Sequence, residues 1–145
     1  MPDSIKYIGD FAFYNCSSLS SITIPSGITK IGESTFQNCS SLISITIPDS
    51  VTSIARYAFR ACHRLQSLVL GDSVEGIGWW AFAECTSLRN IVMGKSVNHV
   101  YSGAFYNCNP FNIYYKGSEK DWNSIRFESS DFPSITTIHY NYVSE

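Results

Sequence analysis

The chain repeats itself with a 23-residue period, and this period constrains its fold more than any other feature. The stretch AFYNCSSLSSITIPSGITKIG begins at Ala12, and TFQNCSSLISITIPDSVTSIA begins one period later, at Thr35. Columns of phenylalanine, of isoleucine or valine, and of leucine keep the same step. So do the five cysteines, Cys16, Cys39, Cys62, Cys85 and Cys108. An internal period of about 20 to 50 residues indicates similar units stacked on one another.

A single unit cannot fold by itself. Its few inward-facing apolar residues bury too little surface to offset the conformational entropy lost when the whole unit is ordered. Stacking buries both faces of each unit, so the stability of the chain becomes a sum of contacts between neighbouring units.

Within a unit, LSSITI alternates with the period of a β-strand, with Ile22 and Ile24 inward and Ser21 and Thr23 outward. Proline or glycine follows and ends the strand. The segment AFYNC predicts a short helical turn on the opposite side. Asparagine ends that turn in three units, where the left-handed conformation that asparagine tolerates is expected: Asn15, Asn38 and Asn107. We therefore predict a β-rich solenoid of about five 23-residue coils with one concave parallel sheet.

Composition excludes several classes of function. The net charge of −2 gives no reason to expect nucleic acid as a partner. No apolar run approaches the roughly 20 residues of a membrane helix, and MPDSIKYIGD lacks the basic start and apolar stretch of a secretory signal. No cofactor is expected. No Ser–His–acid arrangement favours catalysis, so the chain is not expected to be an enzyme.

The cysteines do not have the spacing of a metal site. Zinc sites use ligands paired at short spacing, and this chain has no such pair. Stacked coils bring successive cysteines to about 5 Å, but with parallel Cβ vectors that suit a disulfide badly. We expect a ladder of small buried thiols.

Two surfaces are candidates for partner binding. The first is the outward row of the concave sheet, which is small-featured and nearly neutral and therefore suits an extended protein surface rather than a small molecule. It comprises Ser21, Thr23, Ser44, Thr46, Ser67, Val69, Asn90 and Val92.

The second surface is an aromatic rim. Trp79 occupies a column that is otherwise polar, and is either packed flat or an exposed anchor. Trp80 is expected to be a partly buried wall.

Charged residues allow a third hypothesis. Arg56, Arg60 and Arg64 lie in one unit, where they form either a basic patch for an acidic partner, such as a sialylated or sulfated glycan, or a set of local ion pairs. The register places Arg56 beside Glu33. It also places Asp72 beside Lys95.

The frame A-F-x-x-C-x-x-L-x-x-I-x-I-P, as in IGDFAFYNCSSLSSITIPSGITKIG, resembles the BspA-type (Treponema pallidum-type) leucine-rich repeat. The end of the chain, with IYYKGSEKDWNSI and then TTIHYNY, resembles the C-terminal cap of such arrays. The resemblance implies a surface or secreted protein of a bacterium or protist. For some members it implies adhesion to host glycoproteins such as fibronectin and fibrinogen.

We expect residues 2–115 to form five repeats, the first truncated at its N-terminal side, and residues 116–145 to form the cap. The last repeat, CNPFNIYYKG, is one residue short, Ser118 and Asp121 favour a helix start before Trp122, and ITTIHY from Ile135 predicts a final strand. The first repeat has no cover, so an edge strand there could pair with a second copy. That edge comprises Ser20, Ser21, Ile22, Thr23 and Ile24.

The sequence thus favours a non-catalytic protein-interaction module that binds a protein or glycoprotein, as part of an adhesin-like surface or secreted protein. The alternative is a structural spacer or self-assembling solenoid, joined through the N-terminal edge as a homodimer.

Overall fold

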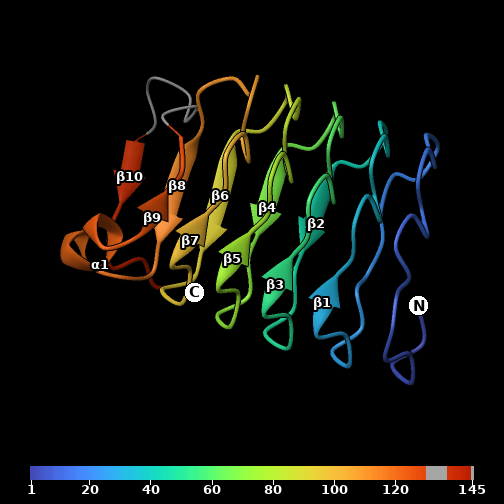
Figure 1. Cartoon of the computed structure of the whole chain (residues 1–145), viewed down its shortest axis with the longest axis horizontal. Helices are drawn as coiled ribbons and strands as arrows, with labels where there is room; N and C mark the ends of the chain where they lie inside the picture. The colour runs from blue at the N-terminus through green and yellow to red at the C-terminus, as the bar shows by residue number, and fades with distance from the viewer. Residues whose placement is uncertain (130–136, 145) are drawn as a thin grey trace.

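The computed structural model describes residues 1–129 and 137–144. In this part of the chain the coils stack side by side along one axis, from the N-terminal coil to the cap (Figure 1). Each coil after the first contributes short strands to parallel sheets, and within the described residues a single short helix follows the last repeat. The predicted parallel β-solenoid with little helix is confirmed.

The predicted sheet, here called sheet B, is formed by the strands that carry the outward polar row. Its strands pair in the order β10-β8-β6-β4-β2. Their bounds are Ser44–Thr46 (β2), Ser67–Val69 (β4), Asn90–Met93 (β6), Asn112–Tyr115 (β8) and Thr137–His139 (β10). Ile45, Leu68, Ile91 and Ile113 are in register and fully buried, so the alternation read from the sequence places the core correctly.

A second parallel sheet, sheet A, was not predicted. It has the order β1-β3-β5-β7-β9 and consists of Lys30–Ile31, Ser53–Ile54, Gly76–Ile77, His99–Val100 and Arg126–Phe127. Each of these strands has two residues, one outward and one inward. The alternation of exposed and buried residues by which a strand is recognised in a sequence is therefore too short to identify it. The column of Ile31, Ile54, Ile77 and Val100, already visible in the sequence, is the buried row of this sheet.

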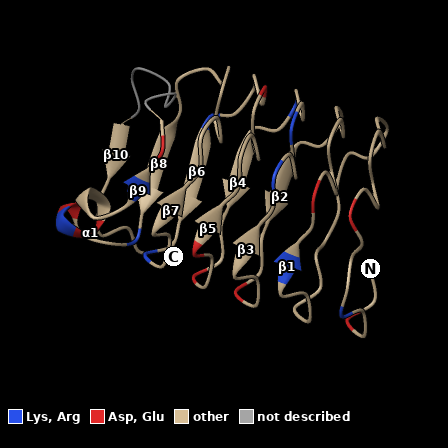
Figure 2. Cartoon of the chain, in the orientation of Figure 1, with Lys and Arg blue, Asp and Glu red and all other residues tan. Residues whose placement is uncertain are grey.

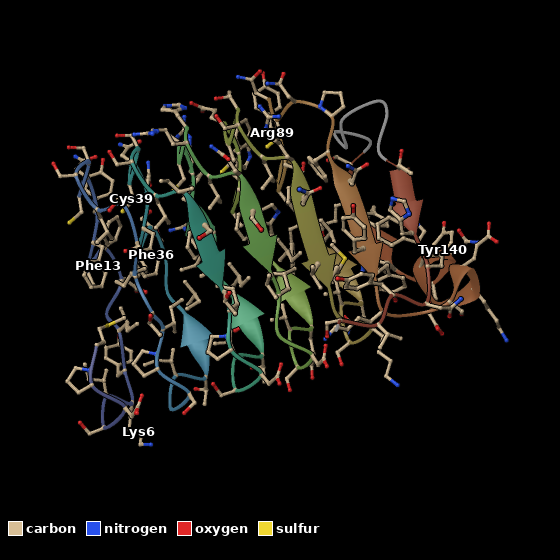
Figure 3. The ribbon with its side chains drawn as sticks, turned by 180° about the vertical axis from the view of Figure 1, so that it is seen from behind. Lys6, Phe13, Phe36, Cys39, Arg89 and Tyr140 are labelled. Carbon is tan, nitrogen blue, oxygen red and sulfur yellow. The ribbon has the colours of Figure 1, made fainter. Side chains whose placement is uncertain are left out.

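The phenylalanine column forms a continuous stack through the core. Phe13, Phe36, Phe59, Phe82 and Phe105 lie face to face, with adjacent ring centroids 5.1–5.5 Å apart and interplanar angles of 3–11°. Figure 3 shows Phe13 and Phe36 in neighbouring coils. The spacing is close to that of hydrogen-bonded strands, so the stack and the sheets fit one coil-to-coil distance.

The predicted helical turns are linked tight turns rather than helix. In residues 9–16, successive backbone N–H groups alternate between two kinds of hydrogen-bond acceptor. Those of Ala12, Tyr14 and Cys16 donate to carbonyl oxygens three residues earlier. Those of Phe11, Phe13 and Asn15 donate instead to carbonyl oxygens of the next coil, at 2.8–2.9 Å. The later coils repeat this pattern, so the turn side of the solenoid is bonded across coils as the sheets are.

Left-handed residues make these turns possible. The asparagine column has φ near +60° at Asn15, Asn38 and Asn107, as predicted, and also at Ala61 and Glu84. A second column, four residues earlier, was missed: Phe11, Ser34, Tyr57, Trp80 and Gly103 all have positive φ. A left-handed residue interrupts the right-handed helical path, which leaves N–H groups available to the neighbouring coil.

The cap extends both sheets. β8 pairs with β6 through Asn112 and Asn90, one residue less than a full repeat apart, which confirms the one-residue deletion. Helix α1, Glu119–Asn123, begins in a capping box in which Ser118 and Asp121 satisfy each other's backbone N–H. β9 then joins sheet A and β10 joins sheet B. Part of the predicted final strand, at residues 135 and 136, lies outside the described residues.

The first coil is less tightly joined than the others. Residues 20–24 were predicted to form the edge strand, yet they lie outside both sheets, although the Ile43 N–H donates to the Ser20 carbonyl oxygen. Apolar residues of this coil are half-buried, including Cys16, Leu19 and Ile22, whereas their equivalents in the three following coils are buried. Self-association through this coil stays a prediction.

The turn geometry predicts that Ala61→Asn stabilises the protein. Alanine at φ +58° carries a left-handed penalty of about 1 kcal/mol that asparagine largely avoids. The position borders a hollow of about 420 Å³, lined in part by Asn15 and Asn38, which has room for the amide. Urea unfolding should show a gain of about 1 kcal/mol. Ser17→Asn places the same side chain at the same hollow without a positive φ, and is expected to change stability by less than about 0.5 kcal/mol. Equal gains in both variants would contradict this explanation.

Candidate protein-binding surface and aromatic ridge

The outward face of sheet B carries no charged side chain on any of its five strands. The predicted row is present at Ser44, Thr46, Ser67, Val69, Asn90 and Val92, and it continues through Asn112, Tyr114, Thr137 and His139. Figure 2 shows these strands without lysine, arginine, aspartate or glutamate. Ser21 and Thr23 are exposed but belong to no strand; they border, with Ser44 and Thr46, a hollow of about 650 Å³.

An aromatic cluster at the cap end of this face was missed. Tyr114 and His139 stack at 4.7 Å with an interplanar angle of 9°, and Tyr142 packs on Tyr114 at 5.1 Å. The one-residue deletion before β8 hides Tyr114 from the repeat columns, and Tyr142 lies beyond the repeats. The alternation in NIYY, with Ile113 and Tyr115 inward, was the available signal that Tyr114 faces outward.

Trp79 is both packed and exposed, so the two predicted alternatives combine. Its side chain is 48% exposed and its ring lies 4.7 Å from that of Tyr101. The indole N–H donates to Glu128 Oε2 at 3.3 Å. Tyr101 in turn stacks on His99 at 3.9 Å, and His99 Nε2 lies 3.0 Å from Glu128 Oε1. Glu128, in the cap, therefore contacts Trp79 of one coil and His99 of the next, and no feature of the sequence predicts these contacts.

Trp80 follows Trp79 directly but packs on different residues. Its side chain is half-buried, as predicted. It packs on Tyr106 at 4.8 Å and over Gly103, where a Cβ would approach its indole nitrogen to 2.8 Å. The guanidinium of Arg60 lies about 6 Å from the rings of both Tyr57 and Trp80. These side chains form a ridge of aromatic residues along the turn side.

The arginines are largely paired, which weakens the basic-patch hypothesis. Arg56 bonds Glu33 at 3.0 Å, as the register predicted, and Arg60 contacts Glu84 Oε1 through two nitrogens, at 2.7 and 3.0 Å. Arg64 is exposed. The predicted pairing of Asp72 with Lys95 is wrong, because the Asp72 carboxylate instead bonds Lys116 Nζ at 2.7 Å. Lys116 directly follows β8, the strand whose position in the repeat is shifted by the one-residue deletion.

The cysteines form the predicted ladder of free thiols. Each thiol from the second coil onward donates to the carbonyl oxygen of a phenylalanine in the preceding coil, at 3.2–3.3 Å. The pairs are Cys39 to Phe13, Cys62 to Phe36, Cys85 to Phe59 and Cys108 to Phe82. Each of these carbonyls also accepts a backbone N–H from its own coil, so the thiol occupies its second lone pair.

Other kinds of site receive no support from the described part of the chain. Within residues 1–129 and 137–144, no group of three or more histidine, cysteine or acidic side chains is placed to hold a metal ion. Among the same residues, no helix is long and apolar enough to cross a membrane.

Comparison with known proteins agrees with this architecture. The model of the BspA type leucine-rich repeat region matches residues 1–112, in six copies. The chain belongs to the BspA-type leucine-rich-repeat family. Solenoids of this family are generally non-catalytic scaffolds that bind other proteins. None of the curated proteins matches the chain.

Solved structures of bacterial leucine-rich proteins share the fold. A leucine-rich cell surface protein of Faecalibacterium prausnitzii is 31% identical, with a TM-score of 0.77 over 97% of this chain. The leucine-rich repeat protein of T. pallidum is 27% identical over 95% of the chain and 71% of its own length, with a TM-score of 0.70. A Bacteroides ovatus protein, 20% identical over 99% of this chain and 55% of its own, with a TM-score of 0.56, shares the fold. The chain spans 38% of the length of the F. prausnitzii protein.

The thiol ladder predicts ordered reactivity toward iodoacetamide. Burial, reinforced by neighbouring thiols, raises the pKa of Cys39 to about 11 and that of Cys62 further. The thiolate is the nucleophile, so at pH 8 these thiols should remain unmodified in the folded protein, whereas the half-exposed Cys16 reacts first. Mass spectrometry of digested peptides measures the order. Labelling of Cys62 as fast as that of Cys16 would contradict the ladder.

Glu128 should make the protein sensitive to acid. Burial opposes its ionisation, but hydrogen bonds from His99, Ser102 and Trp79 outweigh this and lower the pKa of the carboxyl group. Its stabilising effect is thus present above the unfolded pKa of about 4.3 and is lost as pH falls through the lower folded value. Between pH 7 and pH 3, Glu128→Gln should lose less free energy of unfolding than the wild type. Asp3→Asn is the control, and equal losses in Glu128→Gln and wild type would refute this role.

Proposed function

We propose that the chain is a non-catalytic interaction module that binds a protein or glycoprotein through the outward face of sheet B. The observation that carries the proposal is the uncharged row from Ser44 to Thr137, which ends at the stacked pair of Tyr114 and His139. The chain would form part of a surface or secreted protein, as the description of its F. prausnitzii relative suggests.

An uncharged face suits a protein partner for energetic reasons. Charged groups are costly to desolvate, and the cores of protein interfaces are depleted in them. The hydroxyl, amide and valine side chains of sheet B are less costly to desolvate than charged groups would be. The strands beneath them are fixed by the buried row, so little conformational entropy is lost on binding.

Tyr114 is the expected anchor of this face. Tyrosine is enriched among residues that dominate binding energy, because a rigid ring and a hydroxyl contribute together. His139 and Tyr142 hold the ring on two sides, so its orientation is set before a partner arrives. An adhesive role toward matrix glycoproteins follows from the family resemblance and belongs to this proposal.

The test is binding to an immobilised panel of extracellular glycoproteins that includes fibronectin and fibrinogen. Asn90 is exposed at the middle of the face, so Asn90→Lys should place an unpaired charge in the interface and weaken binding about tenfold or more. Thr29→Lys adds the same charge at an exposed position outside sheet B and should bind like wild type.

Three outcomes discriminate between the alternatives. Loss of binding in Asn90→Lys and Tyr114→Ala, with circular dichroism unchanged, would support the sheet B face. Binding that survives both changes but is lost in Trp79→Ala would move the interface to the exposed Trp79, which packs on Tyr101. Absence of binding to the whole panel by folded protein would favour the structural-spacer alternative.

A further inference from the structure

A hollow of about 300 Å³ opens on the outward side of sheet A, away from the proposed docking face. It is bordered by Ser53, Glu75, Gly76, Asn98, His99 and Tyr101, which come from three successive coils. Its size is that of the smaller ligand pockets of proteins. The proposed function makes no use of these residues.

The hollow exists because Gly76 interrupts a row of side chains. Gly76 of β5 lies in register between Ser53 of β3 and His99 of β7. A Cβ built on Gly76 would meet one side-chain atom, of Tyr101, at 4.0 Å, so the backbone is open to solvent there. Gly76 does not have a positive φ, so no backbone strain requires glycine at this position. The absence of a side chain at Gly76 therefore affects the shape of the surface, and the backbone conformation does not depend on it.

One wall of the hollow is a rigid aromatic stack. His99 and Tyr101 lie 3.9 Å apart with an interplanar angle of 5°, and Trp79 supports Tyr101 at 4.7 Å. Glu128 holds both ends of this arrangement, through His99 Nε2 at 3.0 Å and the Trp79 indole N–H at 3.3 Å. The His99 and Glu128 side chains are 20% and 24% exposed, so little of either is free to move in solvent.

The rim presents three different hydrogen-bonding groups in a line. Thr52, Glu75 and Asn98 occupy the same position of successive coils and are exposed. The backbone N–H of Glu75 bonds Thr52 and that of Asn98 bonds Glu75, at 2.8 and 2.9 Å. The backbones that carry this hydroxyl, carboxylate and amide are thus about 4.8 Å apart, and the Thr52 hydroxyl and the Asn98 amide each also donate to a backbone carbonyl oxygen at 3.4 Å. Together they both donate and accept hydrogen bonds.

From this lining we propose that the hollow binds a neutral saccharide. A sugar ring has an apolar C–H face that packs on an aromatic wall, and hydroxyl groups at its edge that bond to carboxylate and amide side chains. The lining holds the Glu75 carboxylate but neither lysine nor arginine, so an anionic sugar would be repelled. Arg56 and Arg60 do not line the hollow, and both are paired with acidic residues.

The experiment fills the hollow. Gly76→Val adds a strand-favouring side chain where a Cβ has room, so the fold should be kept while the ligand is excluded. The probes are neutral oligosaccharides of glucose, galactose, mannose or N-acetylglucosamine, with sulfated heparin oligosaccharides in parallel. Binding is followed by ligand-observed NMR and by intrinsic tryptophan fluorescence, to which Trp79 contributes beside the wall. We expect Gly76→Val to weaken binding of a neutral oligosaccharide about tenfold or more.

Gly9→Val is the matched control. A Cβ there also has room, with Tyr7 at 3.8 Å as the closest atom, and the residue does not line the hollow. It should bind within about twofold of wild type, because its surface is unrelated to the pocket. Should Gly76→Val fail to fold, Asn98→Ala removes an exposed rim amide and is expected to weaken binding as well.

The proposal is overturned if folded wild-type protein binds no neutral oligosaccharide. It is equally overturned if Gly76→Val and Asn98→Ala bind as tightly as wild type, or if only heparin oligosaccharides bind. Because Asn90→Lys acts on sheet B, it should leave saccharide binding unchanged, so failure here is distinct from failure of the proposed protein interface.

Discussion

Backbone hydrogen bonds between coils on the turn side are the interaction on which this solenoid depends. The N–H groups of Phe36 and Asn38 donate to carbonyl oxygens of the next coil at 2.8 and 2.9 Å, and Phe59 and Ala61 repeat the pattern. The two sheets bond adjacent coils on the other sides. Each coil after the first is thus fixed to a neighbour through both sheets and the turn side. These bonds hold the phenylalanine rings at one spacing and bring each thiol from the second coil onward to a carbonyl oxygen of the coil before it.

This arrangement separates stability from function. The inward positions of successive coils hold similar apolar residues and stabilise the fold. The outward positions can therefore differ between coils and serve in binding. On sheet B they form an uncharged face that ends at Tyr114, and on sheet A a missing side chain at Gly76 opens a hollow beside an aromatic wall. Charges gather at the turns and on α1 (Figure 2), and at the turns Arg56 pairs with Glu33 and Arg60 with Glu84 of the adjacent coils. A solenoid of this kind can present two different surfaces without altering its core.

The sequence predicted the buried columns and the local motifs, but it missed part of the repeated backbone geometry and the contacts of the cap. The inward rows, the free thiols, the bond of Arg56 to Glu33 and the capping box at Ser118 follow from period and local pattern. Sheet A was missed because two-residue strands show a single alternation. The left-handed column was missed because Phe11, Tyr57 and Trp80 are not residue types that favour positive φ. Contacts of the cap, such as Glu128 with His99 or Lys116 with Asp72, lie outside the period and need the folded chain.

Native-state amide hydrogen exchange can establish whether bonds between coils hold the stack together. If they do, the amides of Phe59 and Ala61 should open with the same free energy as that of Leu68 in the centre of sheet B, since all three are released when coils separate. Rapid exchange of Phe59 and Ala61 while Leu68 stays protected would contradict this, because the turn side would then be a loosely attached connection and the sheets alone would hold the solenoid.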